Sequence, residues 1–312
     1  MTIIAGFRTP EGIVVCGDTQ ETVTNLSKKS VQKVKVEPWH LNTNLDRGAG
    51  IGLAASFCGA GDGAFIDKMI ALSWKSAESA NSLDEACDRI ETKIKDTYRE
   101  YGTIFQTGAC PSVELIYGVK AEYSSRLFFA RGPIVTEQEG YCSGGAGYYM
   151  ADFLASRLRS GFLSLHQCVI LAAYILFQAK EHVDGCGGES HIAVLRHKGR
   201  SGLVHWARVK AITDLLEAVD RNIGTTLLAA ADLRSTVDIP QAIDTLTQAI
   251  RYYRNRADLE LKEYDIYGES FLPSGQTDKD DLGFVLNDGD IYASELDPES
   301  RPSTSQKSEE PQ

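Results

Sequence analysis

The chain has 312 residues, of which 43% are hydrophobic and 24% charged, and its formal net charge at pH 7 is -11. This length and composition are those of a globular protein with one large core or two smaller ones. The negative charge and the lack of a run of Lys or Arg exclude a nucleic-acid-binding surface.

Membrane insertion and disulfide bonding are not expected either. The longest apolar stretch, residues 168–179, is too short to span a bilayer, and the first residues lack the charged and apolar parts of a signal peptide. Seven cysteines are scattered without a CxxC pair, which is typical of reduced, buried thiols. We therefore expect a cytoplasmic protein.

Four short strands are predicted in the first sixty residues, where β-branched residues lie between glycine and proline turns. Their ranges are 3–8, 13–18, 31–36 and 51–57. Apolar residues at helical spacing then predict a helix over residues 64–74. A capping box of Ser82 and Glu85 opens a second helix that ends near residue 101.

A second group of strands and helices follows in the same order. Its predicted strands are 113–119, 126–131 and 134–139, its helices are 147–159 and 165–182, and the closing strands are 190–196 and 203–209. Two sets of strands, each followed by a pair of helices, predict an α+β fold, a four-layer αββα sandwich. Regular βαβ alternation, which would indicate a parallel sheet, is not seen.

The composition changes after residue 210. Helical patterns at residues 211–220 and 239–264 predict a helical C-terminal extension over residues 211–293. Residues 294–312 are rich in Ser, Pro, Glu and Gln, so a disordered tail is expected there. The domain that carries any chemistry should therefore be residues 1–210.

Thr2 follows Met1 directly, and removal of the methionine would leave a threonine with a free α-amine at the N-terminus. Such a residue carries a nucleophilic hydroxyl and its own base. The unperturbed pKa of an α-amine is roughly 7.7–8.0, and a neighbouring cation lowers it. Lys33 is the candidate cation, and Asp18 would hold its ammonium group by a charge-assisted hydrogen bond.

Each of these residues has an ordinary explanation when taken alone. Thr2 would be a plain second residue, Asp18 a turn residue at a strand end, and Lys33 a solvated charge on a strand. Taken together, they favour an N-terminal nucleophile that needs no cofactor and no metal.

The chain resembles catalytic proteasome β-subunits in residues 2–7 (TIIAGF), 12–22 (GIVVCGDTQET) and 30–34 (SVQKV). It looks closest to the bacterial HslV-like N-terminal nucleophile hydrolases. The resemblance covers about residues 2–209 and implies their fold, with Thr2 as nucleophile and with Asp18 and Lys33 beside it. It further implies that the backbone N–H of Gly59, after the fourth strand, stabilises an oxyanion.

Two further residues are implied by the same resemblance. A serine that contacts the N-terminal amine is expected near residue 143, where either Ser143 or Ala146 stands at its position. We prefer Ser143, because the bacterial relatives show a serine followed by two glycines, whereas Ala146 would leave the hydrogen bond missing. Asp184 would orient the amine through that serine. A metal site is the alternative for this turn, formed by His182, Asp184, Cys186 and His191.

These features predict a threonine endopeptidase that cleaves unfolded chains in a ring-shaped homo-oligomer, with an ATPase or other proteasome-like subunits as further partners. One alternative keeps the nucleophile but acts on a small amide, because fold does not decide the substrate. The other is a catalytically inactive, proteasome-like assembly subunit.

Overall fold

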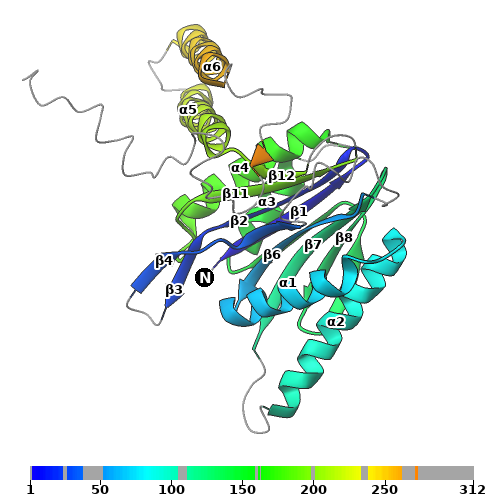
Figure 1. Cartoon of the computed structure of the whole chain (residues 1–312). Helices are drawn as coiled ribbons and strands as arrows, with labels where there is room; N and C mark the ends of the chain where they lie inside the picture. Colours follow the sequence, from blue (N-terminus) through cyan, green and yellow to red (C-terminus); the bar gives the residue numbers. More distant parts are fainter. Residues whose placement is uncertain are drawn as a thin grey trace, which may run out of the picture. The chain divides into compact units, whose positions relative to one another are not determined.

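A computed structural model shows a mixed α/β chain whose described part contains six helices and antiparallel sheets (Figure 1). It describes residues 2–23, 27–37, 52–104, 111–158, 161, 163–197, 201–232, 238–261 and 271–272. The chain divides into two compact units, Met1–Ser274 and Gly275–Gln312. All described residues belong to the first unit, so the tail expected at residues 294–312 lies outside them.

The first sheet has the strand order β10-β1-β2-β11-β12-β13, with antiparallel neighbours throughout. Its strands are β1 (Ile3–Thr9), β2 (Gly12–Asp18), β10 (Tyr141–Gly145), β11 (Ser190–Arg196), β12 (Gly202–Val204) and β13 (Phe271–Leu272). β1 and β2 form a tight hairpin in which Thr9 pairs with Gly12. Gly12 has φ +149°, and an added Cβ would lie 2.0 Å from the Leu195 carbonyl oxygen, so only glycine fits there.

The second sheet has the order β5-β6-β7-β8-β9 and is also antiparallel. Its strands are β5 (Val34–Glu37), β6 (Ala54–Gly61), β7 (Val113–Ala121), β8 (Ser124–Arg131) and β9 (Ile134–Gln138). A separate hairpin of β3 (Gln20–Val23) and β4 (Ser27–Ser30) connects the two sheets in sequence.

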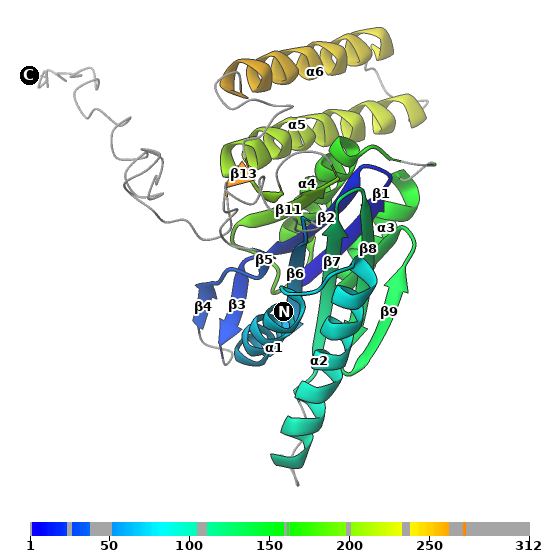
Figure 2. The same cartoon turned by 45° about the vertical axis from the view of Figure 1, so that its right-hand side comes forward.

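Each sheet is covered by one pair of helices (Figures 1 and 2). Helices α1 (Gly63–Ala77) and α2 (Leu83–Ile104) pack on the second sheet, and α3 (Tyr148–Leu158) and α4 (Leu165–His182) pack on the first. The Asp62 side chain caps α1 by accepting a hydrogen bond from the Phe65 N–H. Ser164 and Gln167 form a capping box at the start of α4, which begins and ends as the sequence predicts.

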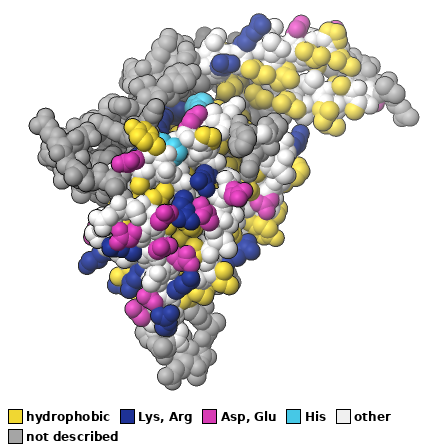
Figure 3. Space-filling view, turned by 90° about the vertical axis from the view of Figure 1, so that its right-hand side faces the viewer, with side chains coloured by type: hydrophobic (Ala, Val, Ile, Leu, Met, Phe, Trp, Pro, Cys, Tyr) yellow, Lys and Arg dark blue, Asp and Glu magenta, His cyan; other side chains and the backbone are white. Residues whose placement is uncertain are grey.

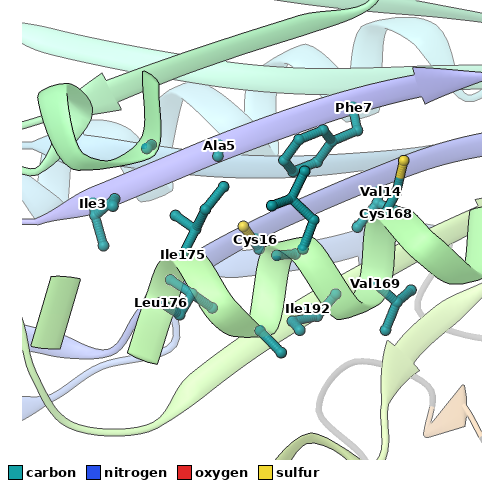
Figure 4. Close-up of a cluster of buried hydrophobic side chains, with 14 of the residues drawn as sticks. Ile3, Ala5, Phe7, Val14, Cys16, Cys168, Val169, Ile175, Leu176 and Ile192 are labelled. Carbon is teal, nitrogen blue, oxygen red and sulfur yellow. The ribbon is translucent and has the colours of Figure 1, made fainter. Parts of the chain in front are cut away.

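Strand alternation in β1 divides its side chains between two hydrophobic clusters. Ile3, Ala5 and Phe7 pack against α4 residues such as Ile175 (Figure 4), whereas Ile4 belongs to a cluster shared with the second sheet. That second cluster includes Ile4, Ile13, Val15, Ile116, Leu127 and Leu195. The sheet that carries residue 2 is therefore packed on both of its faces.

Helices α5 (Trp206–Ala231) and α6 (Ile239–Leu261) follow the last long strand. The Tyr174 hydroxyl and the Gln178 amide of α4 both bond the Asp220 carboxylate of α5, at 2.8 and 2.9 Å. Hydrophobic side chains remain exposed along this helical pair and gather there in Figure 3, including Leu227 and Leu228. No described helix is both long and apolar enough to cross a membrane.

Several predicted elements differ from the observed ones. β5 begins at Val34, three residues later than expected, and the strand predicted over 203–209 ends at Val204 because His205 caps α5. α5 therefore crosses the domain boundary expected at residue 210. β10 was not predicted, because its Ser-Gly-Gly segment has weak strand propensity and is held by pairing with β1. The six cysteines that are described are buried and form no disulfide with one another, and Cys110 lies outside the described residues.

Replacing Gly6 with alanine should destabilise the protein, because β1 passes close to the second sheet at this point. An added Cβ would lie 2.7 Å from a methyl carbon of Ile116 and 3.0 Å from one of Leu127. Overpacking of this kind lowers the free energy of unfolding by about 1–3 kcal/mol. Urea unfolding of Gly6→Ala against the wild type measures the effect.

Gly224→Ala is the matched control. Gly224 lies within α5, and an added Cβ would have no described atom within 4 Å. Alanine should therefore raise the free energy of unfolding by about 0.5–1 kcal/mol through helix propensity. Equal effects of the two substitutions would contradict the close packing of the sheets at Gly6.

Candidate active site

Thr2 lies at the start of β1 with its side chain against Lys33. The Lys33 Nζ donates to the Thr2 Oγ1 at 2.8 Å, and Thr2 is only 8% exposed. The same ammonium group donates to the Asp18 Oδ1 at 3.0 Å and to the Gln20 carbonyl oxygen. An ammonium group has three protons, and here three acceptors face it. Its position beside the Thr2 hydroxyl is thus fixed by two further bonds.

Asp18 is fully buried at the end of β2. Its Oδ1 accepts from the Ile3 N–H at 3.1 Å as well as from Lys33, and its Oδ2 accepts from the Gly187 N–H at 3.1 Å. A buried carboxylate is stable only when paired and hydrogen-bonded, and this one has both kinds of partner. Asp18 therefore ties the first strand, the lysine and the turn after α4 together.

Lys33 is brought to this place by the connection between the β3–β4 hairpin and β5. The Val31 N–H bonds the Thr19 carbonyl at 2.8 Å, and Val34 pairs with Cys58 of β6. Only one residue separates the end of β2 from β3, so Asp18 and Gln20 reach the same ammonium group. The structure thus brings Thr2, Asp18 and Lys33 together through direct hydrogen bonds.

The turn after β10 holds the carbonyl group of Thr2. The Gly147 N–H donates to the Thr2 carbonyl oxygen at 3.2 Å, and Ile3 pairs with Gly145. Gly145 has φ +77°, and an added Cβ would lie 2.2 Å from that same oxygen. Ala146, between these glycines, lines a cavity together with Thr2.

Ser143 does not line the cavity beside Thr2, where the preferred alignment with the family placed it. Its hydroxyl donates to the Asp152 Oδ1 of α3 at 2.6 Å, and it lines a separate cavity whose lining does not include Thr2. Strand alternation is the reason, because Ser143 pairs with Ala5, whose side chain packs toward α3 and α4. Ala146 lines the cavity together with Thr2 instead, and its side chain carries no hydroxyl.

Asp184 also differs from its expected place. It is exposed in the turn that follows α4, while the carboxylate that Ser143 contacts is Asp152. The turn does reach the site, but through the backbone N–H of Gly187 on Asp18. Asp152 carries no family signal in the sequence and is found only when α3 is placed on β10.

Gly59 lies inside β6, paired with Leu115, and an added Cβ would lie 2.5 Å from Ile66 of α1. Its predicted role as an oxyanion donor stays a prediction. The neighbouring Cys58 packs its sulfur against Gly17, where an added Cβ would lie 2.6 Å from it. Burial raises the pKa of the Cys58 thiol well above its usual range, so it remains protonated and unreactive.

The cavity beside Thr2 has a volume of about 290 Å³. It is lined by Thr2, Glu21, Ala60, Gly61, Ser112, Glu114, Gly145 and Ala146. Thr2 thus lines this cavity, whereas Asp18 and Lys33 are not part of its lining. Within the described ranges, no group of three or more His, Cys, Asp or Glu side chains is arranged to hold a metal, which removes support from the alternative of a site at His182, Asp184, Cys186 and His191.

Solved structures of Anbu proteins share this fold. Anbu from Yersinia bercovieri, described as an ancestral β-subunit, has 11% sequence identity and a TM-score of 0.58 over 76% of this chain and 100% of its own. An Anbu mutant from Hyphomicrobium sp. strain MC1 has 13% identity and a TM-score of 0.57, over 73% and 99% of the two chains. The helical assembly of the Anbu complex from Pseudomonas aeruginosa has 12% identity and a TM-score of 0.55, over 71% of this chain and 95% of its own.

The chain matches no protein-family model and no curated protein sequence. The structural neighbours correct one expectation from the sequence: they are Anbu proteins, a proteasome-like group, so the HslV-like resemblance is wrong. Short motifs such as those around Thr2, Asp18 and Lys33 do not by themselves separate groups of proteins that have the same fold. At identities of 11–13%, the likeness shows the fold alone.

Replacing Asp18 with asparagine should destabilise the protein strongly, because the buried Lys33 ammonium would lose its counter-charge. Breaking one partner of a buried ion pair lowers the free energy of unfolding by about 3–5 kcal/mol. The double variant Asp18→Asn, Lys33→Met should lose less than the sum of the two single variants, since it leaves no unpaired charge. Urea unfolding of all three variants measures this coupling.

Glu217→Gln serves as the control, because it breaks an exposed ion pair with Arg221 at 2.7 Å. Exposed pairs spaced by four residues in a helix contribute only about 0.3–0.5 kcal/mol. If Asp18→Asn lowered stability no more than Glu217→Gln, the account of a buried, paired Lys33 would not stand.

Proposed function

We propose that the chain is an N-terminal threonine hydrolase that cleaves peptide bonds, with Thr2 as the nucleophile after removal of Met1. The observation that supports this best is the contact of 2.8 Å between the Lys33 Nζ and the Thr2 Oγ1, backed by the buried Asp18. A hydroxyl bonded to a fixed cation, and opening into a cavity, is poised to act as a nucleophile.

In the first step the Thr2 Oγ attacks the substrate carbonyl carbon, and its proton passes to the free α-amine of Thr2. The Lys33 ammonium cannot accept that proton, but its charge stabilises the negative oxygen of Thr2 as the proton leaves. Asp18 and Gln20 hold Lys33 in place and do not touch the substrate. Their role is therefore to position the cation.

The attack produces a tetrahedral intermediate with a negative oxygen, which needs N–H donors that are already in place. We propose the Gly59 N–H as this donor, because Gly59 directly precedes Ala60 and Gly61, which line the cavity. The carbon–nitrogen bond then breaks, the leaving amine takes the proton from the α-amine, and an ester of Thr2 remains. Water then loses a proton to the same amine and attacks the ester carbon. The bond from that carbon to the Thr2 Oγ breaks, and the amine returns the proton to this oxygen, which restores Thr2.

One observation favours the second candidate, an inactive assembly subunit. Ala146, with only a methyl group, lines the cavity with Thr2 where the family resemblance implies a serine. The Ser143 hydroxyl donates to Asp152, and no hydrogen bond among the described residues joins it to Asp184, so the relay from Asp184 through Ser143 to the amine is not part of the mechanism. The labelling experiment below separates the two candidates.

For the fold, we propose the four-layer αββα arrangement of the N-terminal nucleophile hydrolases over residues 1–210, followed by a helical extension over residues 211–293 that contains most of α5 and all of α6. The hydrophobic cluster that Ile4 and Ile116 share between the sheets supports the stacking of the layers. We also propose a homo-oligomer, since one structural neighbour is a helical assembly. We do not extend the proposal to an ATPase partner.

A peptide epoxyketone tests the nucleophile, because its two-point attachment needs both the hydroxyl and the free α-amine of Thr2. Mass spectrometry of the N-terminal peptide should show an adduct on Thr2 in the wild type and in Thr2→Ser. The adduct should be absent in Thr2→Ala and in protein that retains Met1. Lys33→Met should label at least about a hundredfold more slowly, as expected for removal of a group that stabilises developing charge.

An unlabelled Thr2 in folded, correctly processed protein would rule out the proposed chemistry and leave the assembly subunit. Glu217→Gln, far from Thr2 on α5, should label at the wild-type rate and controls for nonspecific loss.

Sedimentation velocity tests the oligomer. We expect a species of several protomers at micromolar concentration, because the described chain leaves hydrophobic side chains such as Leu228 and Tyr252 exposed on α5 and α6. Leu228→Glu with Tyr252→Glu should reduce the average mass if these helices form contacts between protomers. A wild-type chain that sediments only as a monomer would overturn this part of the proposal.

A further inference from the structure

Two carboxylates, those of Glu21 and Glu114, line the cavity into which Thr2 opens. The remaining lining is neutral and small, with Ala60, Gly61, Ser112, Gly145 and Ala146 beside them. No described cation belongs to this lining, and Lys33 lies behind Thr2. A group that enters the cavity therefore meets the nucleophile and two negative charges.

Glu114 is placed by the register of the second sheet. In β7 it stands opposite Ala60 of β6 on one side and Arg131 of β8 on the other. Its Oε2 accepts from the Gly145 N–H at 2.6 Å, which holds the carboxylate next to the turn that contacts Thr2. Its Oε1 is 3.2 Å from the Arg131 Nε.

Glu21 approaches from the opposite side, on the β3–β4 hairpin. It pairs across the hairpin with Lys29, whose Nζ lies 3.0 Å from the Glu21 Oε2. Its other carboxylate oxygen lies against the start of α1, where an added Cβ on Gly63 would be 2.8 Å away. The absence of a side chain at Gly63 thus gives Glu21 room at the cavity.

The cationic partners of both carboxylates lie on the solvent side. The side chains of Lys29 and Arg131 are 59% and 64% exposed, so water and salt weaken these two pairs. Arg131 lines the neighbouring cavity, which also contains Ser143 and Asp152. At Glu114 the Arg131 Nε lies against Oε1, while Oε2 accepts from the Gly145 N–H beside Thr2.

From this arrangement we propose that the cavity selects substrates with a cationic side chain, arginine or lysine, on the residue whose carbonyl carbon Thr2 attacks. Glu114 and Glu21 are the residues that determine this specificity. The cavity volume of about 290 Å³ lies just below that of ordinary ligand pockets, roughly 300–1,000 Å³, and suits a single side chain.

Charge complementarity favours a cationic side chain in this cavity over an acidic or an apolar one. A guanidinium or ammonium group forms charge-assisted hydrogen bonds with the two carboxylates, whereas an acidic side chain is repelled by both. An apolar side chain would strip water from the carboxylates without replacing its hydrogen bonds. The proposal rests on the proposed function for the place of the scissile bond, but not for the binding of the side chain.

Binding can be measured without catalysis in the Thr2→Ala protein, using two acetylated tripeptide amides that end in arginine and in citrulline. Citrulline has nearly the shape of arginine and no charge. We expect the arginine peptide to bind at least about tenfold more tightly, as a charged hydrogen-bond partner should. Titration calorimetry at low and at physiological salt gives the two affinities.

Glu114→Gln and Glu21→Gln should each bring the ratio of the two affinities toward one. Glutamine keeps an oxygen that accepts from the Gly145 N–H, so the turn beside Thr2 should stay in place. Glu122→Gln is the matched control, because Glu122 is exposed just past the far end of β7, and its ratio should equal that of the parent protein.

Equal affinities for the two peptides, or a preference for arginine that survives in Glu114→Gln and Glu21→Gln, would overturn the proposal. Labelling of the wild type by epoxyketones that end in arginine and in norleucine separates this failure from that of the function. If both epoxyketones label Thr2 equally, the result supports Thr2 as the nucleophile and rules out the proposed selectivity. If neither labels Thr2 while the arginine peptide still binds selectively, the acidic pocket stands and the peptidase proposal falls.

Discussion

The ammonium group of Lys33, whose side chain is 9% exposed, constrains the arrangement of the whole site. Its three protons meet the Thr2 hydroxyl, the Asp18 carboxylate and the Gln20 carbonyl, which belong to the start of β1, the end of β2 and the start of β3. A buried cation is tolerated only with such partners, because an unpaired charge in a protein interior is very unfavourable. The two strands and the hairpin can therefore take only the register that completes this set.

Both sheets contribute residues to the surroundings of Thr2. The first sheet supplies the strand that carries Thr2 and, through β10, the Gly145 turn that holds its carbonyl. The second supplies Ala60 and Glu114 on the cavity wall. Packing between the sheets, through residues such as Ile4 and Ile116, thus links core stability to the geometry around the nucleophile.

Features set by local sequence were predictable, and those set by distant pairing were not. Helix α4 and strand β11 follow their patterns to the residue, and Asp18 and Lys33 lie beside Thr2 as their chemistry suggested. The choice between Ser143 and Ala146 depended on the pairing of β10 with β1, which the glycine-rich segment does not reveal. Glu114 reaches the cavity through register alone, and no local motif marks it.

The central claim is that the Thr2 hydroxyl, supported by Lys33, is the reacting group. The most direct measurement is a crystal structure of the processed protein after reaction with a β-lactone, which forms an ester with a reactive hydroxyl. The account predicts an ester on the Thr2 Oγ, with the Lys33 Nζ still within hydrogen-bond distance of that oxygen and of Asp18. An unmodified Thr2, or an ester with Lys33 turned away from it, would contradict the account.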